Sequence, residues 1–249
     1  MSIGLANCLI CGKKIVYSQD AIEVTCEVCG KQETGHCTCE DGHYVCDACH
    51  RQKGVEYILD LCSSSSSTDP VEIMTEAMNN QAIYPNGPEH HTLVGASLIC
   101  AFCNAGGKPV AGVRSAGEGA TQDELKRAAL NELKNRSLQV PGGTCGFWGT
   151  CGAAVSAGQA LSIMNGSTPM TKEPWAQCQR LTSRVLDKLA DLGGPRCCKR
   201  TGYTAVLETI DYVAENLGVQ MTKPEKVTCT FFARNEECLK KECPYFPSK

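Results

Sequence analysis

From residue 71 onward, apolar residues recur three and four positions apart, which is the spacing of helices with one buried face. The stretch 90–102 is apolar almost all round and predicts a central helix. Residues 174–192 and 204–217 predict amphipathic helices that end at glycine. No strands alternate with these helices, and no glycine-rich phosphate loop follows a strand. The sequence therefore predicts an all-helical region.

Local signals mark where several of these helices begin. Asp69 and Pro70 supply an N-cap and a proline at the first helical position, and Thr121 with Glu124 forms a capping box. Residues 152–164 are rich in alanine, glycine and serine, so this helix allows another backbone, or a cofactor, to approach closely.

Before residue 63 the pattern changes to a short segment crowded with cysteine, glycine and β-branched residues. The polar run over 63–70 predicts a linker. We therefore expect a double zinc-binding domain over 1–62, the linker over 63–70, and an all-helical, cysteine-rich domain over 71–249 with a cysteine knuckle at its end. The fold class is mainly α, with a treble-clef or cross-brace arrangement in the small N-terminal domain.

Composition narrows the environment. Nineteen of the 249 residues are cysteine, and the formal net charge is -3. The start of the chain shows no signal peptide, and no apolar run reaches the length of a membrane span, so we expect a cytoplasmic protein. In a reducing compartment, many cysteines indicate metal or thiol chemistry rather than disulfides. Because so many thiols oxidise in air, an anaerobic source is expected.

The N-terminal cysteines form four pairs with the spacing of metal ligands. The first two pairs read Cys-x-x-Cys-Gly-Lys, a zinc-knuckle form, and the last pair opens a predicted helix whose N-terminus favours thiolate. Four pairs in series suggest cross-bracing, in which alternate pairs bind one ion, while sequential pairing is the main alternative. The cross-braced sets are Cys8, Cys11, Cys37 and Cys39 on one ion and Cys26, Cys29, Cys46 and Cys49 on the other, with His36, His43 or His50 able to replace a cysteine.

Zinc is the metal expected at these two closed sites. A segment this short buries little apolar area, so metal binding would supply its folding energy. Residues 1–62 hold five Lys/Arg against nine Asp/Glu, which disfavours nucleic-acid binding and favours a structural or protein-docking module.

The cysteines of the helical region are candidates for a second kind of site. Cys145 and Cys151 are flanked by glycines and precede the small-residue helix, which leaves room for a bulky group or else for a tight helix contact. Cys197 and Cys198 lie between cations that favour thiolate, and Arg196 is suited to hold a carboxylate or phosphate. The proposed cofactor ligands are Cys100, Cys103, Cys145, Cys151, Cys197 and Cys198, and the proposed catalytic residues are Cys197, Cys198, His90, His91 and Arg196.

The last three cysteines, Cys229, Cys238 and Cys243, resemble a third metal knuckle that lacks one ligand. Cys178, Cys197 or Cys198 could complete it, as could substrate or water. Cys62 is expected to be a buried core residue, and so is Cys178 if it is not the missing ligand.

These motifs carry a resemblance to a family. His90-His91, the run from Pro141 to Ala154, Gly193 to Arg200 and the end from Cys243 resemble an uncharacterised cysteine-rich domain family of anaerobic bacteria and archaea. Its members occur fused to, or encoded near, methyltransferase-like and radical-SAM proteins, which implies a protein partner of that type. There is a weaker resemblance to helical proteins named for a Cys-Gly-Cys-Ala-x-x-Gly pattern, to which redox activity is attributed, although Cys151-Gly-Ala lacks the second cysteine.

Three functions remain in competition. The first is a redox-active or iron–sulfur-cluster protein that acts through its helical domain and docks to a redox or methyltransferase-type enzyme through its zinc sites. The second is a non-catalytic adaptor or accessory protein for a methyltransferase or radical-SAM partner enzyme. The third is a metal-thiolate enzyme of methyl or sulfur transfer. No membrane or nucleic-acid partner is expected.

Overall fold

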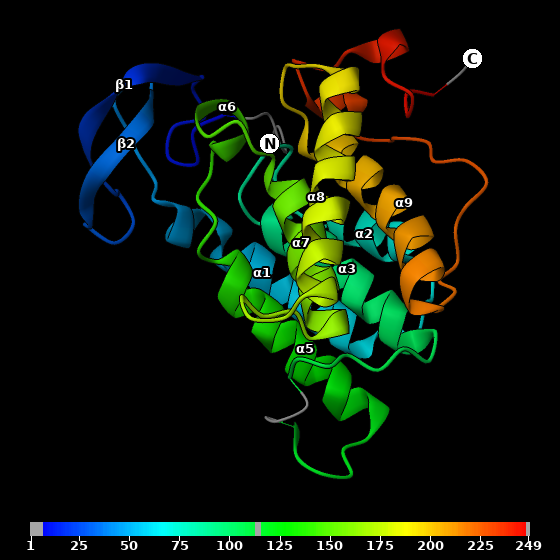
Figure 1. The fold of residues 1–249 in the computed structure, drawn as a ribbon. Helices are drawn as coiled ribbons and strands as arrows, with labels where there is room; N and C mark the ends of the chain where they lie inside the picture. The colour runs from blue at the N-terminus through cyan, green and yellow to red at the C-terminus, as the bar shows by residue number, and fades with distance from the viewer. Residues whose placement is uncertain (1–6, 113–115, 248–249) are drawn as a thin grey trace.

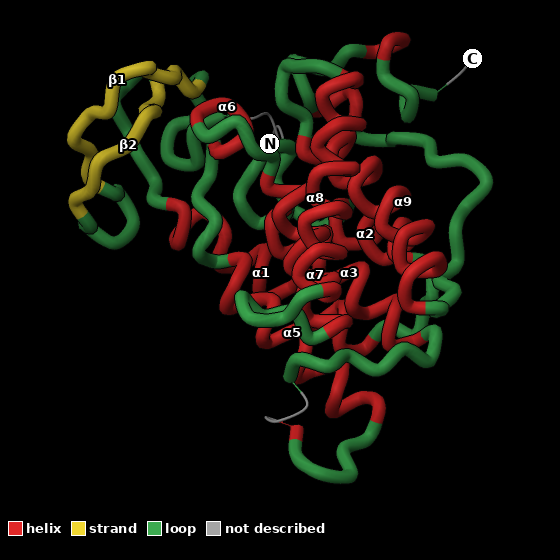
Figure 2. The backbone as a smooth tube through the Cα atoms, in the orientation of Figure 1, coloured by secondary structure: helices red, strands yellow, loops and turns green. Residues whose placement is uncertain are grey.

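The computed structural model of the protein describes residues 7–112 and 116–247. A bundle of helices forms most of it, and a two-stranded hairpin stands at one end of the bundle (Figures 1 and 2). The mainly helical fold with two N-terminal cysteine groups able to hold zinc is therefore confirmed. The elements are β1 (Ile15–Thr25), β2 (Gln32–Cys39), α1 (Asp47–Ser64), α2 (Pro70–Met78), α3 (His90–Asn104), α5 (Gln122–Ser137), α6 (Thr144–Phe147), α7 (Gly152–Asn165), α8 (Glu173–Leu192), α9 (Cys198–Leu217), and the 3-10 turns η1 (Phe232–Arg234) and η2 (Lys240–Glu242).

The hairpin has almost no apolar core of its own. Its strands pair antiparallel from Ile15 opposite Cys39 to Thr25 opposite Gln32, with an irregularity between Tyr17 and Ile22. Apart from Cys39, the only buried side chain in the two strands is that of Val24. An isolated two-stranded hairpin is marginal in water, so other interactions hold this one.

Helix α3 is the centre of the bundle, as its all-round apolar pattern predicts: every residue from His90 to Cys103 is buried. It packs against α7, α5, α1, α2 and α9. One close approach is at Gly95, whose N–H donates to Ser156 Oγ of α7 at 2.8 Å. The small residues of α7 thus admit neighbouring helices, since Thr182 of α8 lies just as closely against Gly158.

The predicted helix starts are largely confirmed. Asp69 Oδ1 accepts the N–H groups of Val71 and Glu72, and the capping box of Thr121 and Glu124 is complete. Helix α9 is the exception, because it begins at Cys198. Cys197 is its N-cap and accepts the N–H of Arg200, which makes the cationic run around the two cysteines a helix start.

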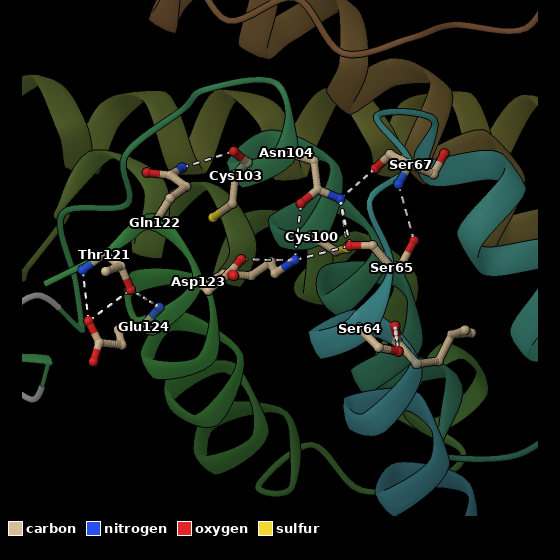
Figure 3. Close-up of polar contacts among 12 residues, drawn as sticks. Ser64, Ser65, Ser67, Cys100, Cys103, Asn104, Thr121, Gln122, Asp123 and Glu124 are labelled. Atoms are coloured by element: carbon tan, nitrogen blue, oxygen red, sulfur yellow. Dashed lines mark hydrogen bonds and ion pairs between the residues drawn. The ribbon is translucent and has the colours of Figure 1, made fainter.

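The serine-rich segment is held against the bundle (Figure 3). Asn104 Nδ2 donates to the carbonyl oxygens of Ser65 at 3.0 Å and Ser67 at 2.7 Å. The buried Lys126 donates to Ser65 O at 3.0 Å. Helix α1 runs without a break from the N-terminal cysteines into the bundle, where Cys62 is fully buried.

None of the described helices is both long and apolar enough to cross a bilayer. The expectation of an absent signal peptide rests on the first residues of the chain, and residues 1–6 lie outside the described part.

The packing at Gly95 can be tested by adding one methyl group. An alanine Cβ there would lie 2.8 Å from Leu133 Cδ1 and 2.9 Å from Ser156 Oγ. We expect Gly95→Ala to lower the free energy of unfolding by about 1–3 kcal/mol, measured by urea denaturation. Gly146→Ala is the control, because nothing lies within 4 Å of its added Cβ. Equal stability of the two variants would contradict this packing.

Candidate metal centres and cavity

The first candidate metal centre brings together Cys8, Cys11, Cys39 and His43. Cys11 Sγ lies 3.7 Å from Cys39 Sγ, and His43 Nδ1 lies 3.4 Å from the same sulfur. Backbone N–H groups donate to the sulfurs, from Ile10 to Cys8 at 3.4 Å and from His43 to Cys39 at 3.3 Å. Burial raises the pKa of Cys39, but the N–H groups of Asp41 and His43 outweigh it and lower the pKa to about 7.

The second centre brings together Cys26, Cys29, Cys46 and Cys49. Cys29 Sγ and Cys46 Sγ lie 3.8 Å apart, and the N–H of Cys46 donates to Cys26 Sγ at 3.3 Å. Although burial raises the pKa of Cys26, the N–H groups of Cys46, Cys29 and Val28 lower it to about 6. Cys46 is the N-cap of α1 and Cys49 lies in its first turn, so the helix begins at the metal site.

Both centres fit a tetrahedral ion. With Zn–S bonds of about 2.3 Å, tetrahedral geometry separates two sulfurs by about 3.8 Å. The sulfur separations of 3.7 and 3.8 Å agree with this value. The two ligand sets also alternate along the chain, which is the cross-braced order that the sequence suggested.

One predicted ligand is corrected. His43, and not Cys37, joins Cys8, Cys11 and Cys39. Successive residues of a strand advance by about 3.3 Å, so Cys37, which precedes Cys39 by two residues in β2, lies about 6.6 Å away from it along the strand. It pairs there with Tyr17, away from the first knuckle. The turn at Gly42 brings His43 back instead, with His43 O accepting the N–H of Cys39 at 3.0 Å.

Cys37, which is not a ligand of the first centre, lines a cavity of about 440 Å³ between the hairpin and the helical bundle. Two further predicted thiols reach the same cavity, Cys145 from α6 and Cys198 from the start of α9. Tyr17, His36, Asp47, His91, Phe147, Trp148 and Arg196 are also among the lining residues.

The loop that carries Cys145 is fixed to α1 and to the hairpin. Gly142 N–H donates to Asp47 Oδ2 at 2.6 Å. Arg51 donates to Val140 O at 3.2 Å and to Leu138 O. The ring of Phe147 stacks on His36 of β2, with centroids 4.5 Å apart. The cavity therefore has walls from three distant parts of the sequence.

Arg196 is the principal cation of the cavity. Its guanidinium lies over the Tyr17 ring at 4.9 Å, and within residues 7–112 and 116–247 no carboxylate lies within 4 Å of it. Burial lowers the pKa of Arg196, but the charges of Tyr17, Cys198, Glu237 and Cys145 outweigh burial and raise it. Burial raises the pKa of Cys198 to about 12, against the lowering effects of the Gly87 N–H and of Arg196.

His91 and His90 have separate surroundings. His91 lines the cavity, and its Nδ1 lies 3.2 Å from Val140 O, which makes Nδ1–H the donor. Burial lowers its pKa, so the ring is neutral. His90 does not line the cavity. It belongs instead to a buried chain of hydrogen bonds and ion pairs.

That chain joins α3 to α9 and α1. His90 Nδ1 contacts Glu89 Oε1 at 3.3 Å, and His90 Nε2 accepts from Lys199 Nζ at 2.9 Å. His50 of α1 lies 3.6 Å from the other oxygen of Glu89. Burial and the neighbouring Lys199 lower the pKa of His90 to about 4, while His50 and His90 hold the pKa of Glu89 far below its usual range despite burial.

The other predicted ligands fall into different environments. Cys100 and Cys103 are buried in α3, where Cys100 neighbours Cys62 rather than Cys145. Cys151 caps α7 beside the cavity and within electrostatic reach of Cys145 and Cys198. Cys178 is buried, as expected of a core residue. Cys197 and Cys198 line different spaces. Cys198 lines the cavity, whereas Cys197 lines a small pocket at the start of α9 together with Cys229, Cys238 and Cys243.

Several residues of these sites carry no recognisable local signal in the sequence. Glu89 and Lys199 look like ordinary charged residues at helix starts, and Tyr17 and Asp47 look like surface positions. Only the tertiary fold brings them beside the histidines and thiols.

Comparison with known proteins gives a family but no function. A family described as a family of unknown function, DUF5714, matches residues 58–246, and the chain therefore belongs to it. Neither the search of curated proteins nor the search of solved structures found a match to the chain. The resemblance to an uncharacterised family is thus confirmed, while the link to anaerobes and to the Cys-Gly-Cys-Ala proteins stays an expectation.

The assignment of His43 instead of Cys37 as a ligand predicts how many metal ions each variant binds. The wild-type protein should bind two ions in the N-terminal region, and His43→Ala should remove one of them because three ligands hold zinc less tightly. Cys37→Ala is the matched variant and should keep both. Elemental analysis of zinc per chain checks this, and loss of an ion from Cys37→Ala alone would restore the original assignment.

The buried chain predicts a dependence of stability on pH. Because the pKa of His90 is lowered to about 4, the unfolded state binds a proton that the folded state does not as pH falls below about 6.5. The free energy of unfolding should therefore fall on going from about pH 7.5 to about pH 5, with His90 contributing about 2 kcal/mol of the loss. Glu89 stays ionised in the folded state over this range and adds little.

His90→Gln isolates that contribution. The variant should show a smaller loss by about 2 kcal/mol in urea denaturation at the two pH values, while acid release of metal affects both proteins alike. Parallel pH profiles would show that His90 is not the group responsible.

Proposed function

We propose that this protein is a metal-supported thiol redox protein whose chemistry takes place in the cavity beside the hairpin. The observation that carries the proposal is the convergence of Cys145 and Cys198 with Arg196 in one cavity of about 440 Å³. A volume of this order suits a small molecule. Cys151 and Cys37 lie next to these groups and add further thiols.

The N-terminal metal ions have a structural role in this proposal, and zinc is the metal the ligands suit. Each centre has four protein ligands of sulfur and nitrogen, which leaves no open position for a substrate. The ions hold the hairpin that presents Tyr17, His36 and Cys37 to the cavity.

The thiols differ in access, which suggests an order of reaction. Cys145 is exposed, whereas Cys198 is partly buried and its sulfur is strongly desolvated. Cys145 is therefore the attacking thiol and Cys198 the resolving one. Arg196, which has no carboxylate within 4 Å among the described residues, binds an anionic group of the reactant.

The reaction is a thiol–disulfide exchange with a small disulfide that carries a carboxylate. Cys145 attacks one sulfur of the reactant and releases the first product thiol. Cys198 then attacks the mixed disulfide at Cys145 and releases the second. Two protein thiols become one disulfide, and the reactant disulfide becomes two thiols, so electrons and protons balance.

An adaptor is the second candidate, favoured by apolar side chains at the knuckle tips. Leu9, Ile10 and Val28 are 39%, 46% and 62% exposed, which suits contact with a partner protein such as a redox or methyltransferase-type enzyme. Complete inertness of the cavity thiols would favour this function over the redox one.

The redox function can be tested by mass spectrometry after reaction with a carboxylate-bearing disulfide under anaerobic conditions. The wild-type protein should lose two free thiols and form a Cys145–Cys198 disulfide. Cys198→Ser should instead accumulate the mixed disulfide on Cys145, and Arg196→Gln should slow the reaction about tenfold, since a charge-assisted contact is lost.

Cys178→Ser is the control, because this buried thiol of α8 is remote from the lining of the cavity. It should react like the wild-type protein. A protein whose Cys145 stays reduced under these conditions, with both metal ions retained, would contradict the proposal.

A further inference from the structure

We infer that Cys197, Cys229, Cys238 and Cys243 bind an iron–sulfur cluster at the start of α9. All four line one pocket. The segment after α9, residues 218–247, is called the C-terminal arm, and it returns to the end of the bundle where α8 ends and α9 begins (Figure 1). The three cysteines of the arm thus acquire the fourth ligand that their own segment lacks.

Hydrogen bonds within the arm and to α9 set this arrangement. The N–H of Cys229 donates to Tyr245 O at 2.7 Å, which closes the arm on itself. The hydroxyl of Tyr245 lies 2.8 Å from Thr204 Oγ1, which attaches the arm to α9. The rings of Tyr203 and Tyr245 are in contact, with centroids 5.4 Å apart.

The sulfurs are surrounded by donors in the way that metal thiolates require. Arg200 N–H points at Cys197 Sγ at 3.5 Å, Phe231 N–H at Cys229 Sγ at 3.4 Å and Lys240 N–H at Cys238 Sγ at 3.3 Å. The contact of Ile10 N–H with the metal ligand Cys8, at 3.4 Å, has the same form. Such N–H···S bonds stabilise thiolate and tune the potential of a cluster.

No three of these four sulfurs lie within 4.8 Å of one another, although the thiols are close enough for their charges to interact, and this wider spacing agrees with a cluster. Among the described residues, only the two N-terminal groups bring their ligand atoms within 4.8 Å of one another. A single tetrahedral ion needs sulfurs about 3.8 Å apart. In a four-iron cluster each thiolate binds a different iron, which holds the sulfurs further apart.

The surroundings suit an anionic inorganic core. The space left between these side chains is about 20 Å³, room for little more than one water molecule, so a cluster would bind only with an outward shift of the C-terminal arm. Phe231, Phe232 and Phe246 supply an apolar shell. Lys199 and Arg200 line the pocket and offset the negative charge of cluster and thiolates.

The position of the cluster deepens the proposed redox function, on which this step rests. Cys197 is a cluster ligand and Cys198, the next residue, lines the cavity, so one peptide unit separates the cluster from a reacting thiol. The cluster is therefore placed to pass electrons singly to or from the Cys145–Cys198 disulfide. Complete reduction of that disulfide takes two electrons, delivered one at a time to the cluster by an external one-electron carrier protein that is itself oxidised, and two protons from solvent, which yield the two thiols.

The cluster is tested on the full-length protein, purified anaerobically and then treated with ferrous iron and sulfide. We expect equal amounts of iron and sulfide, about four of each per chain, in addition to zinc, with visible absorbance that dithionite bleaches and an EPR signal on reduction. Cys238→Ser and Cys243→Ser should lose the iron and keep the two zinc ions, which shows that the rest of the fold persists.

Cys145→Ser and Cys178→Ser are the controls and should retain the cluster. An iron-free protein after this treatment, or a third zinc ion bound by the four C-terminal ligands, would overturn the inference. Cys198→Ser separates the two proposals: it should retain iron and sulfide while it forms no Cys145–Cys198 disulfide. A protein with the cluster but with an unreactive Cys145 would contradict the cavity chemistry alone.

Discussion

Bonds between metal and thiolate are the interaction on which the N-terminal wall of the cavity depends. The hairpin buries one apolar side chain, Val24, apart from its cysteine, and cannot hold its position by the hydrophobic effect. Structural zinc sites supply on the order of 10–16 kcal/mol in small peptides, which exceeds the stability of most domains. If both N-terminal cysteine groups hold a metal ion as proposed, the positions of Tyr17, His36 and Cys37 depend on two ions whose ligands take no part in the proposed thiol–disulfide exchange.

A second constraint is the group of buried ionisable side chains around Glu89, next to the cavity. Glu89 is completely buried, and it is in contact with His50 of α1 and His90 of α3, whose ring accepts a hydrogen bond from Lys199 of α9. A buried carboxylate without such partners would cost several kcal/mol. These contacts fix the positions of α1, α3 and α9 relative to one another. Because Cys197 and Cys198 directly precede Lys199 in the chain, their positions are fixed as well.

What the sequence could predict was local. Helical periodicity, the caps at Asp69 and Thr121, and the alternating metal ligands depend on residues near one another in the chain. The choice of His43 over Cys37 depends on where a strand ends, a one- or two-residue question that spacing does not resolve. The separation of Cys197 from Cys198 and the meeting of Cys37, Cys145 and Cys198 depend on tertiary packing, which no short motif records.

Helix α1 has a mechanical consequence for the cavity. It starts at the second metal centre and ends in the bundle core, so its 18 residues form a rod of about 27 Å that joins the two parts without a hinge. A rod held at both ends transmits position and does not bend with each binding event. The second metal centre therefore keeps a fixed distance from the bundle core, and the cavity that lies between the hairpin and the bundle keeps its span.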